Sequence, residues 1–193
     1  MINPADTITI IQARLESTRL ANKILYPFGY ESILGTIIKT CLSMGPEVMV
    51  LGDRASTAVV KPLADHYGVW YESGDSGSLL EDFINVSTTY GYINRVCADS
   101  PLTSGPLTRY LFMVGNPLTD WTIMSGVPPG MVGGIARREA LQRLQGQSPT
   151  TSEKRHVTSG LIGRDSFTVQ WVPAPNLTVD TITDYNRVRE MLG

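Results

Sequence analysis

The chain has 193 residues, of which 42% are hydrophobic and 18% are charged, and its formal net charge is -2. These values predict one globular domain over residues 1–193 and argue against a disordered chain. The small negative net charge gives no support to a general nucleic-acid-binding role.

The apolar pattern argues against a membrane protein. No apolar run is long enough to span a bilayer, and the amino terminus lacks the charged and apolar regions of a signal peptide. We therefore expect a cytoplasmic protein with no membrane partner. Cys41 and Cys97 have no metal-site spacing and form no disulfide framework, so we expect two buried free thiols.

Short apolar, β-branched runs alternate with helical patterns along the chain. In chain order the periodicity predicts a strand at 7–12, a helix at 33–42, a strand at 48–51, a helix at 58–67, a strand at 69–71, a helix at 79–86, a strand at 92–97, a helix at 107–114, strands at 121–124 and 134–136, a helix at 138–144, a strand at 168–172 and a helix at 183–192. This alternation predicts the α/β class, with helices packed on a mostly parallel sheet.

Local signals set several of these boundaries. Ser32 and Thr181 are predicted N-cap residues, and Gly45 follows the first helix as a stop signal. Pro62 conflicts with the helix at 58–67 unless it falls in the first turn. Glycine and proline, or polar residues, predict loops at 126–134 and 145–151.

The segment that follows the first predicted strand concentrates positive charge and hydroxyl groups. Its cations and hydroxyls are Arg14, Arg19 and Lys23, with Ser17 and Thr18. Ligands bind beyond the carboxyl ends of strands in open α/β sheets, and arginine and lysine suit phosphate oxygens. The pattern matches neither a Walker A loop nor a dinucleotide fingerprint. A triphosphate site is one interpretation, and a solvated surface loop is the other.

Residues 10–23, IIQARLESTRLANK, resemble the signature of the cytidylyltransferase family that activates acidic sugars. The similarity is to the spore-coat polysaccharide type and to enzymes that make CMP-linked nonulosonic or octulosonic acids. The matching positions are Arg14, Ser17, Thr18, Arg19, Leu20 and Lys23. Four later segments resemble further family motifs in the same order: residues 93–102, 137–141, 155–162 and 176–192. The resemblance therefore covers nearly the whole chain.

The resemblance implies a fold and a reaction. The implied fold is a three-layer α/β/α sandwich with a mostly parallel mixed sheet, as in nucleotide-diphospho-sugar transferases. The implied reaction is attack of a sugar hydroxyl on the α-phosphorus of CTP, which releases pyrophosphate and forms a CMP-sugar for a surface polysaccharide or glycan. Mg²⁺ would be the cofactor, CTP and an acidic sugar the substrates, and a homodimer the assembly.

The resemblance also implies roles for individual residues. Asp99 and Asp180 would hold Mg²⁺, although Asp99 also suits a turn before Ser-Pro and Asp180 suits a helix entry. Arg14, Lys23 and Asp99 would be catalytic. Arg95 would orient the metal site, contact the acidic substrate or form a structural ion pair. The implied nucleotide-binding set is Ala13, Arg14, Ser17, Thr18, Arg19, Lys23 and Arg95.

The chain departs from the family pattern at four places. Ala21-Asn22 replaces Pro-Gly before Lys23, and asparagine is the residue that best tolerates the positive φ angle that glycine allows. Glu72 replaces an arginine, Ser78 an aspartate and Gly134 a glutamate. These changes remove family charges from the sugar side, so two alternatives stay open. One is a non-catalytic relative that acts as a structural or interaction subunit, and the other is a nucleotidyltransferase for another base or sugar phosphate.

Overall fold

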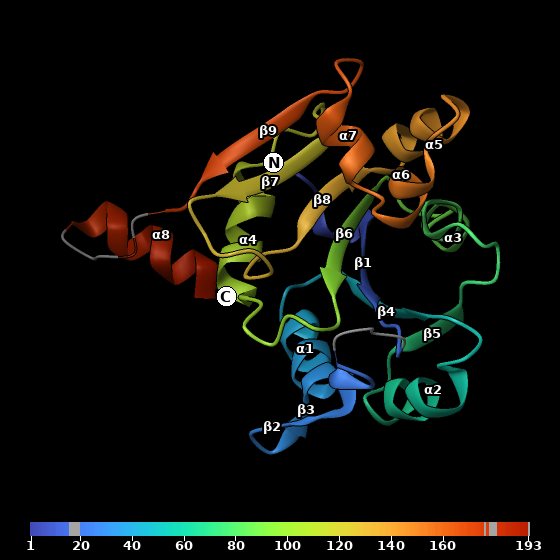
Figure 1. Ribbon diagram of the computed structural model, residues 1–193. Coiled ribbons are helices and arrows are strands. Elements are labelled where there is room, and N and C mark those ends of the chain that lie inside the picture. The colour runs from blue at the N-terminus through green and yellow to red at the C-terminus, as the bar shows by residue number, and fades with distance from the viewer. Residues whose placement is uncertain (16–19, 176, 178–180, 193) are drawn as a thin grey trace.

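The computed structural model describes residues 1–15, 20–175, 177 and 181–192 (Figure 1). Its elements in chain order are η1 Pro4–Asp6, β1 Thr7–Gln12, η2 Lys23–Leu25, β2 Pro27–Phe28, β3 Glu31–Ser32, α1 Ile33–Leu42, β4 Glu47–Gly52, α2 Thr57–His66, β5 Trp70–Ser73, α3 Leu79–Val86, β6 Tyr92–Cys97, α4 Gly105–Val114, β7 Trp121–Ser125, β8 Gly134–Arg137, α5 Arg138–Gly146, α6 Thr151–Arg155, α7 Ser159–Gly163, β9 Val169–Pro173 and α8 Ile182–Leu192.

Seven strands form one mixed sheet in the order β5-β4-β1-β6-β8-β7-β9. The pairs β5–β4, β4–β1, β1–β6 and β7–β9 are parallel, whereas β8 runs antiparallel to both of its neighbours. The mostly parallel mixed sheet predicted from the sequence is confirmed. The carboxyl ends of β5, β4, β1, β6, β7 and β9 therefore lie at one edge, together with the amino end of β8.

Helices cover both faces of this sheet, which gives the expected three layers. Along β1, Ile8 and Ile10 belong to the core under α3 and α5, whereas Ile11 belongs to the core under α1 and α2. A third apolar cluster joins α4 to β7, β8 and β9 and contains Met191 of α8. Figure 1 shows α3, α5, α6 and α7 gathered together, and α8 beside α4 at the far left.

The predicted helix caps are present. The Ser32 hydroxyl accepts a hydrogen bond from the Gly35 N–H at 3.1 Å, and the Thr181 hydroxyl accepts one from the Asp184 N–H at 3.2 Å. Each bond satisfies an N–H group that the first helical turn leaves without a backbone partner. Gly45 has a φ angle of 106°, as its place after α1 requires.

Two local expectations were wrong, and the predicted conflict at Pro62 is present. Pro62 lies in the interior of α2 rather than in its first turn, where it has no N–H to donate to the carbonyl four residues earlier. The loop predicted at 145–151 is shorter, because α5 extends to Gly146 and α6 begins at Thr151. Cys41 is buried, and burial raises its pKa to about 12, but Cys97 is only half-buried because it ends β6 at the open edge.

Several short elements were not predicted: the hairpin of β2 and β3, and the five-residue helices α6 and α7. None of the helices in the described part of the chain combines the length and apolarity needed to cross a bilayer.

Candidate functional site

Lys23 and Asp99 form an ion pair at the carboxyl edge of the sheet. They are 76 positions apart in the sequence. Lys23 begins η2 after the loop from β1, and Asp99 lies two positions beyond the end of β6. Because β1 and β6 are adjacent and parallel, the fold brings the two loops together. The side chains are 25% and 39% exposed, so a ligand can reach both.

The turn before Lys23 shows how this chain replaces the family's glycine. Asn22 has a φ angle of 54° and adopts the left-handed conformation. Its N–H donates to the Leu15 carbonyl at 3.3 Å, and its own carbonyl accepts from the Leu25 N–H at 2.9 Å. The expectation that asparagine preserves the turn is confirmed. The turn aims Lys23 back towards the end of β6.

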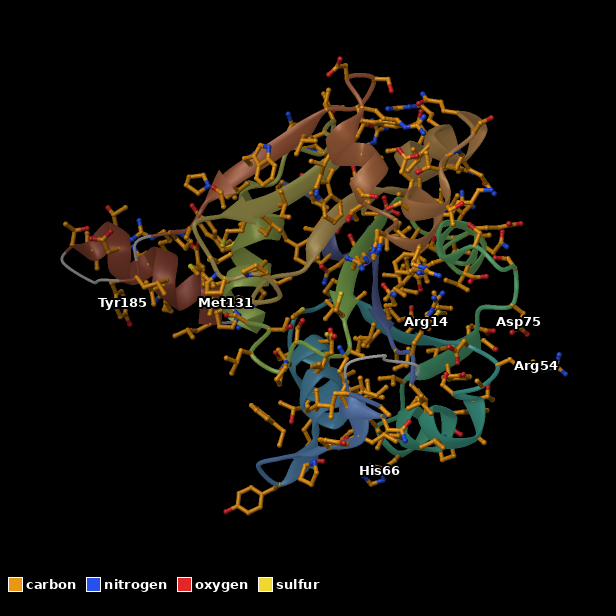
Figure 2. The ribbon with its side chains drawn as sticks, viewed as in Figure 1. Arg14, Arg54, His66, Asp75, Met131 and Tyr185 are labelled. Carbon is orange, nitrogen blue, oxygen red and sulfur yellow. The ribbon has the colours of Figure 1, made fainter. Side chains whose placement is uncertain are left out.

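Ala13 and Arg14 continue the chain directly beyond β1. Ala13 is fully buried, and its N–H donates to the Leu51 carbonyl at 2.8 Å, which extends the pairing with β4. Arg14 is half-buried and forms no ion pair with a described residue. Figure 2 shows Arg14 within the outline of the protein, whereas Arg54 on the loop after β4 points outward. Arg14 is therefore a half-buried cation held directly beyond β1, at the same edge of the sheet as the Lys23–Asp99 pair.

Four of the predicted site residues, Ser17, Thr18, Arg19 and Asp180, lie outside the described residues. Their roles in phosphate and metal binding stay predictions. Within the described ranges no group of three or more His, Cys, Asp or Glu side chains is placed to hold a metal ion. Asp99 has the oxygen chemistry that Mg²⁺ prefers and lies at the right edge, so the described part of the site fits one carboxylate ligand.

Arg95 does not form the structural ion pair that was one interpretation of it, since no described carboxylate contacts it. Its guanidinium instead donates to the Gln12 side-chain oxygen at 2.9 Å, and its Nε is buried with no hydrogen-bond partner. Sequence reasoning missed Gln12. The available signal was a long amide side chain that closes a strand made of threonine and isoleucine.

Two of the departures from the family pattern have structural explanations. A side chain at Gly134 would overlap the indole ring of Trp121, so tryptophan fills the space that a larger residue would need. The Ser78 hydroxyl caps α3 by accepting from the Glu81 N–H at 3.4 Å. Both positions have a packing or capping role in this chain in place of a charge.

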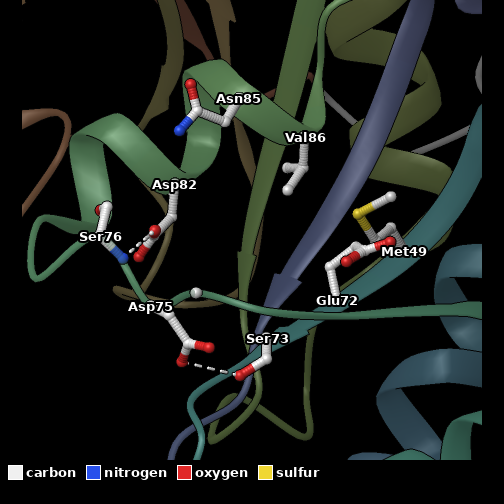
Figure 3. Close-up of a pocket in the computed structure, with 9 residues that line it drawn as sticks. Met49, Glu72, Ser73, Asp75, Ser76, Asp82, Asn85 and Val86 are labelled. Atoms are coloured by element: carbon white, nitrogen blue, oxygen red, sulfur yellow. Dashed lines mark hydrogen bonds between the residues drawn. The ribbon is translucent and has the colours of Figure 1, made fainter.

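Glu72, the third departure, lines a pocket between the end of β5 and α3 (Figure 3). The pocket has a volume of about 480 Å³, and Asp75 and Asp82 line it as well. Asp82 is buried and accepts a hydrogen bond from the Ser76 N–H at 3.2 Å. The described lining contains no Lys or Arg, so this side of the edge is acidic and repels anions.

The loop before β8 braces the segment that follows Asp99. The Thr103 hydroxyl donates to the Gly130 carbonyl at 3.0 Å, and the Ser104 N–H donates to the Met131 carbonyl at 2.7 Å. Gly130 has a φ angle of 86°, which favours glycine there. This loop before β8 lies on the β8 side of the carboxyl edge of the sheet, whereas the acidic pocket lies on the β5 side.

No protein-family model matches the chain. Among curated proteins it is similar to the spore coat polysaccharide biosynthesis protein SpsF of Bacillus subtilis, with 24% identity over 96% of this chain and 86% of that protein. A cytidylyltransferase from Leptospira borgpetersenii has a similar structure, with a TM-score of 0.80 and 25% identity over 94% of this chain and 84% of the other. A CMP:2-keto-3-deoxy-manno-octonic acid synthetase complexed with CTP has the same fold, with a TM-score of 0.66 and 16% identity over 96% of this chain and 98% of the other.

Proposed function

Because the chain resembles the cytidylyltransferase family in sequence and in fold, we propose that it is a metal-dependent nucleotidyltransferase that transfers CMP from CTP to a sugar. The observation that carries the proposal is the Lys23–Asp99 pair, which the fold assembles from two motifs that are 76 positions apart in the sequence. Cytidylyl transfer needs cations for the phosphates and a carboxylate for a metal, and both kinds of group meet here.

In this proposal the cations of the first loop hold the triphosphate. Arg14 presents a planar fork to the phosphate oxygens, and Lys23 adds a compact charge. Bound Mg²⁺ would neutralise phosphate charge and help pyrophosphate to leave, with Asp99 as a ligand and Asp180 as the proposed second one. The acceptor hydroxyl then attacks the α-phosphorus, while the chain supplies position and charge.

The ion pair between Lys23 and Asp99 indicates how the ligand-free site balances its charge. Each side chain neutralises the other when no ligand is bound. Metal and triphosphate would separate them, since Asp99 would turn to the metal and Lys23 to a phosphate. We therefore expect triphosphate and metal to bind cooperatively, because each one releases the group that the other needs.

The finer parts of the proposal concern the acceptor and its setting. We propose an acidic sugar acceptor, a role in surface polysaccharide or glycan synthesis, and a cytoplasmic location where CTP is available. The similarity to SpsF supports the pathway. The acidic pocket lined by Glu72 is unsuited to a carboxylate, so the acceptor's acid group belongs on the opposite side of the edge.

Calorimetric titration of the chain with CTP, with and without Mg²⁺, tests the proposal. Titrations with ATP, GTP and UTP measure its selectivity. We expect selective CTP binding that Mg²⁺ strengthens. With an acidic-sugar panel, Asp99→Asn should nearly abolish Mg²⁺-dependent pyrophosphate release, whereas Asp65→Asn, at an exposed position of α2, should not. Metal-independent binding, or wild-type turnover by Asp99→Asn, would remove the metal assignment.

One observation favours a second candidate function. Three carboxylates line the pocket beside β5, where the family pattern has an arginine, and Trp121 fills the space over Gly134. These features suit a non-catalytic relative that has kept the fold as an interaction subunit. Absence of binding to all four nucleoside triphosphates in the same titration would support that alternative.

A further inference from the structure

Arg95 lies in the middle of the sheet, and no described side chain neutralises its charge. It belongs to β6, between β1 and β8, and is half-buried. Its register partner on β8 is Gly134, which has no side chain to offer. The Nε of Arg95 is buried with no hydrogen-bond partner, and no described carboxylate forms an ion pair with the guanidinium.

This arrangement costs free energy unless something else is bound. A guanidinium stays protonated at every physiological pH. Holding a partly desolvated charge without a counter-ion is unfavourable, and so is a buried donor with no acceptor. The nearest carboxylate along the chain, Asp99, is paired with Lys23. An anionic ligand at this edge would supply the missing counter-charge.

Gln12 holds the guanidinium without neutralising it. Its side-chain oxygen accepts from Arg95 at 2.9 Å, and its backbone lies between β4 and β6, where its carbonyl accepts from the Ala98 N–H at 3.0 Å. The residue is therefore fixed by the sheet. An amide oxygen satisfies one donor and leaves the positive charge available, whereas a carboxylate at this place would form an ion pair.

We propose that Gln12 is a positioning residue that presents Arg95 as an open cation for an anionic group of the substrates. The proposal rests on the proposed function and adds a residue to it. The shared ligand chemistry is a phosphate or carboxylate oxygen. Its two possible sources are the triphosphate of the nucleotide and the acid group of the acceptor, both of which the edge beyond β1 and β6 would hold.

Three variants test this role: Gln12→Glu, Gln12→Met and Arg95→Met, with Gln142→Glu at an exposed position of α5 as the charge-matched control. The probes are CTP with Mg²⁺, inorganic pyrophosphate, and glucuronate with glucose as its uncharged counterpart. We expect Gln12→Glu and Arg95→Met to weaken binding of the relevant anion at least tenfold, and the control to leave it unchanged. Weaker binding of CTP and pyrophosphate would identify phosphate as the ligand group. Weaker binding of glucuronate alone would identify the carboxylate.

A double-mutant cycle separates positioning from a merely structural role. If Gln12 acts through Arg95, Gln12→Met weakens anion binding in the wild type but changes it less than about twofold once Arg95→Met is present. An equal loss in both backgrounds overturns the positioning role. Unchanged binding of every anion in all three variants, with CTP still bound, overturns the inference and leaves the proposed function standing. A wild-type chain that binds none of the anions overturns both.

Discussion

Lys23 stands at the point where the phosphate and metal parts of the proposed site meet. It follows a left-handed Asn22, and its ammonium group contacts Asp99. In a ligand-free site this contact lets the charge of each residue offset that of the other. The contribution of Lys23 to the free energy of nucleotide binding is therefore a difference between two interactions. One is the contact with the Asp99 carboxylate that it loses, and the other is the contact with a phosphate that it gains.

Lys23→Ala should weaken CTP binding by at least tenfold, about 1.4 kcal/mol, in the presence of Mg²⁺. CMP binding should weaken less, because the monophosphate lacks the β- and γ-phosphates that Lys23 is proposed to hold. Calorimetric titration of both nucleotides measures this difference. Lys61→Ala provides the control, since Lys61 pairs with Asp65 on exposed α2. Equal losses for CTP and CMP would contradict the phosphate role of this loop.

At the scale of single elements, strands β7 and β8 pack together because the large Trp121 side chain of β7 lies over Gly134 of β8, which has no side chain. Trp121 is 3% exposed and occupies the space over Gly134. The strands pair antiparallel, with Trp121 opposite Ala136 in register. A glutamate at position 134, as in the family pattern, would need the indole ring to move. In this chain the absence of a side chain at position 134 and the packing of Trp121 therefore depend on each other.

Gly134→Ala should lower the free energy of unfolding by roughly 1–3 kcal/mol, because the new methyl group overpacks against the indole ring. Chemical denaturation measures the effect. Combining Gly134→Ala with Trp121→Leu should cost less than the sum of the two single changes, because leucine frees the space. Gly146→Ala is the control, since nothing lies near a side chain at that position. Additive losses would show that the two residues are independent.

The order of the longer strands and helices follows directly from sequence periodicity, because β-branched apolar runs alternate with segments of helical spacing along the chain. Periodicity does not reveal which strands are neighbours, so the β8 reversal between β6 and β7 appears only in the structure. The pairing of Lys23 with Asp99 depends on the parallel adjacency of β1 and β6, which periodicity does not reveal either. Motif resemblance identified both residues, whereas the Arg95–Gln12 contact needed the register of β1 against β6.

Across the whole molecule, stability in acid depends on carboxylates that are paired in the folded state. Hydrogen bonds from the Arg164 guanidinium, both at 2.7 Å, and from the Thr150 N–H lower the pKa of Glu153 to about 2. This carboxylate joins the start of α6 to the residue after α7, and these helices cover part of the core under α3 and α5. Arg143 lowers the pKa of Asp120 in the same way, against the raising effect of burial.

Lowering the pH from 4.5 to about 2 should therefore destabilise the fold through Glu153. Its folded pKa lies below the ordinary value of 4.5, so its contribution is complete above that pH and is lost as protonation approaches the folded pKa. Glu153→Gln keeps the shape and the helix cap but removes the charge. We expect its melting temperature to be below that of the wild type at neutral pH, and this difference in melting temperature to narrow as the pH falls from 4.5 to about 2.

Glu190→Gln is the control, at an exposed carboxylate of α8 that forms no ion pair with a described residue. It should keep the wild-type dependence of melting temperature on pH. A constant gap at every pH would mean that the Arg164 contact acts through shape rather than charge.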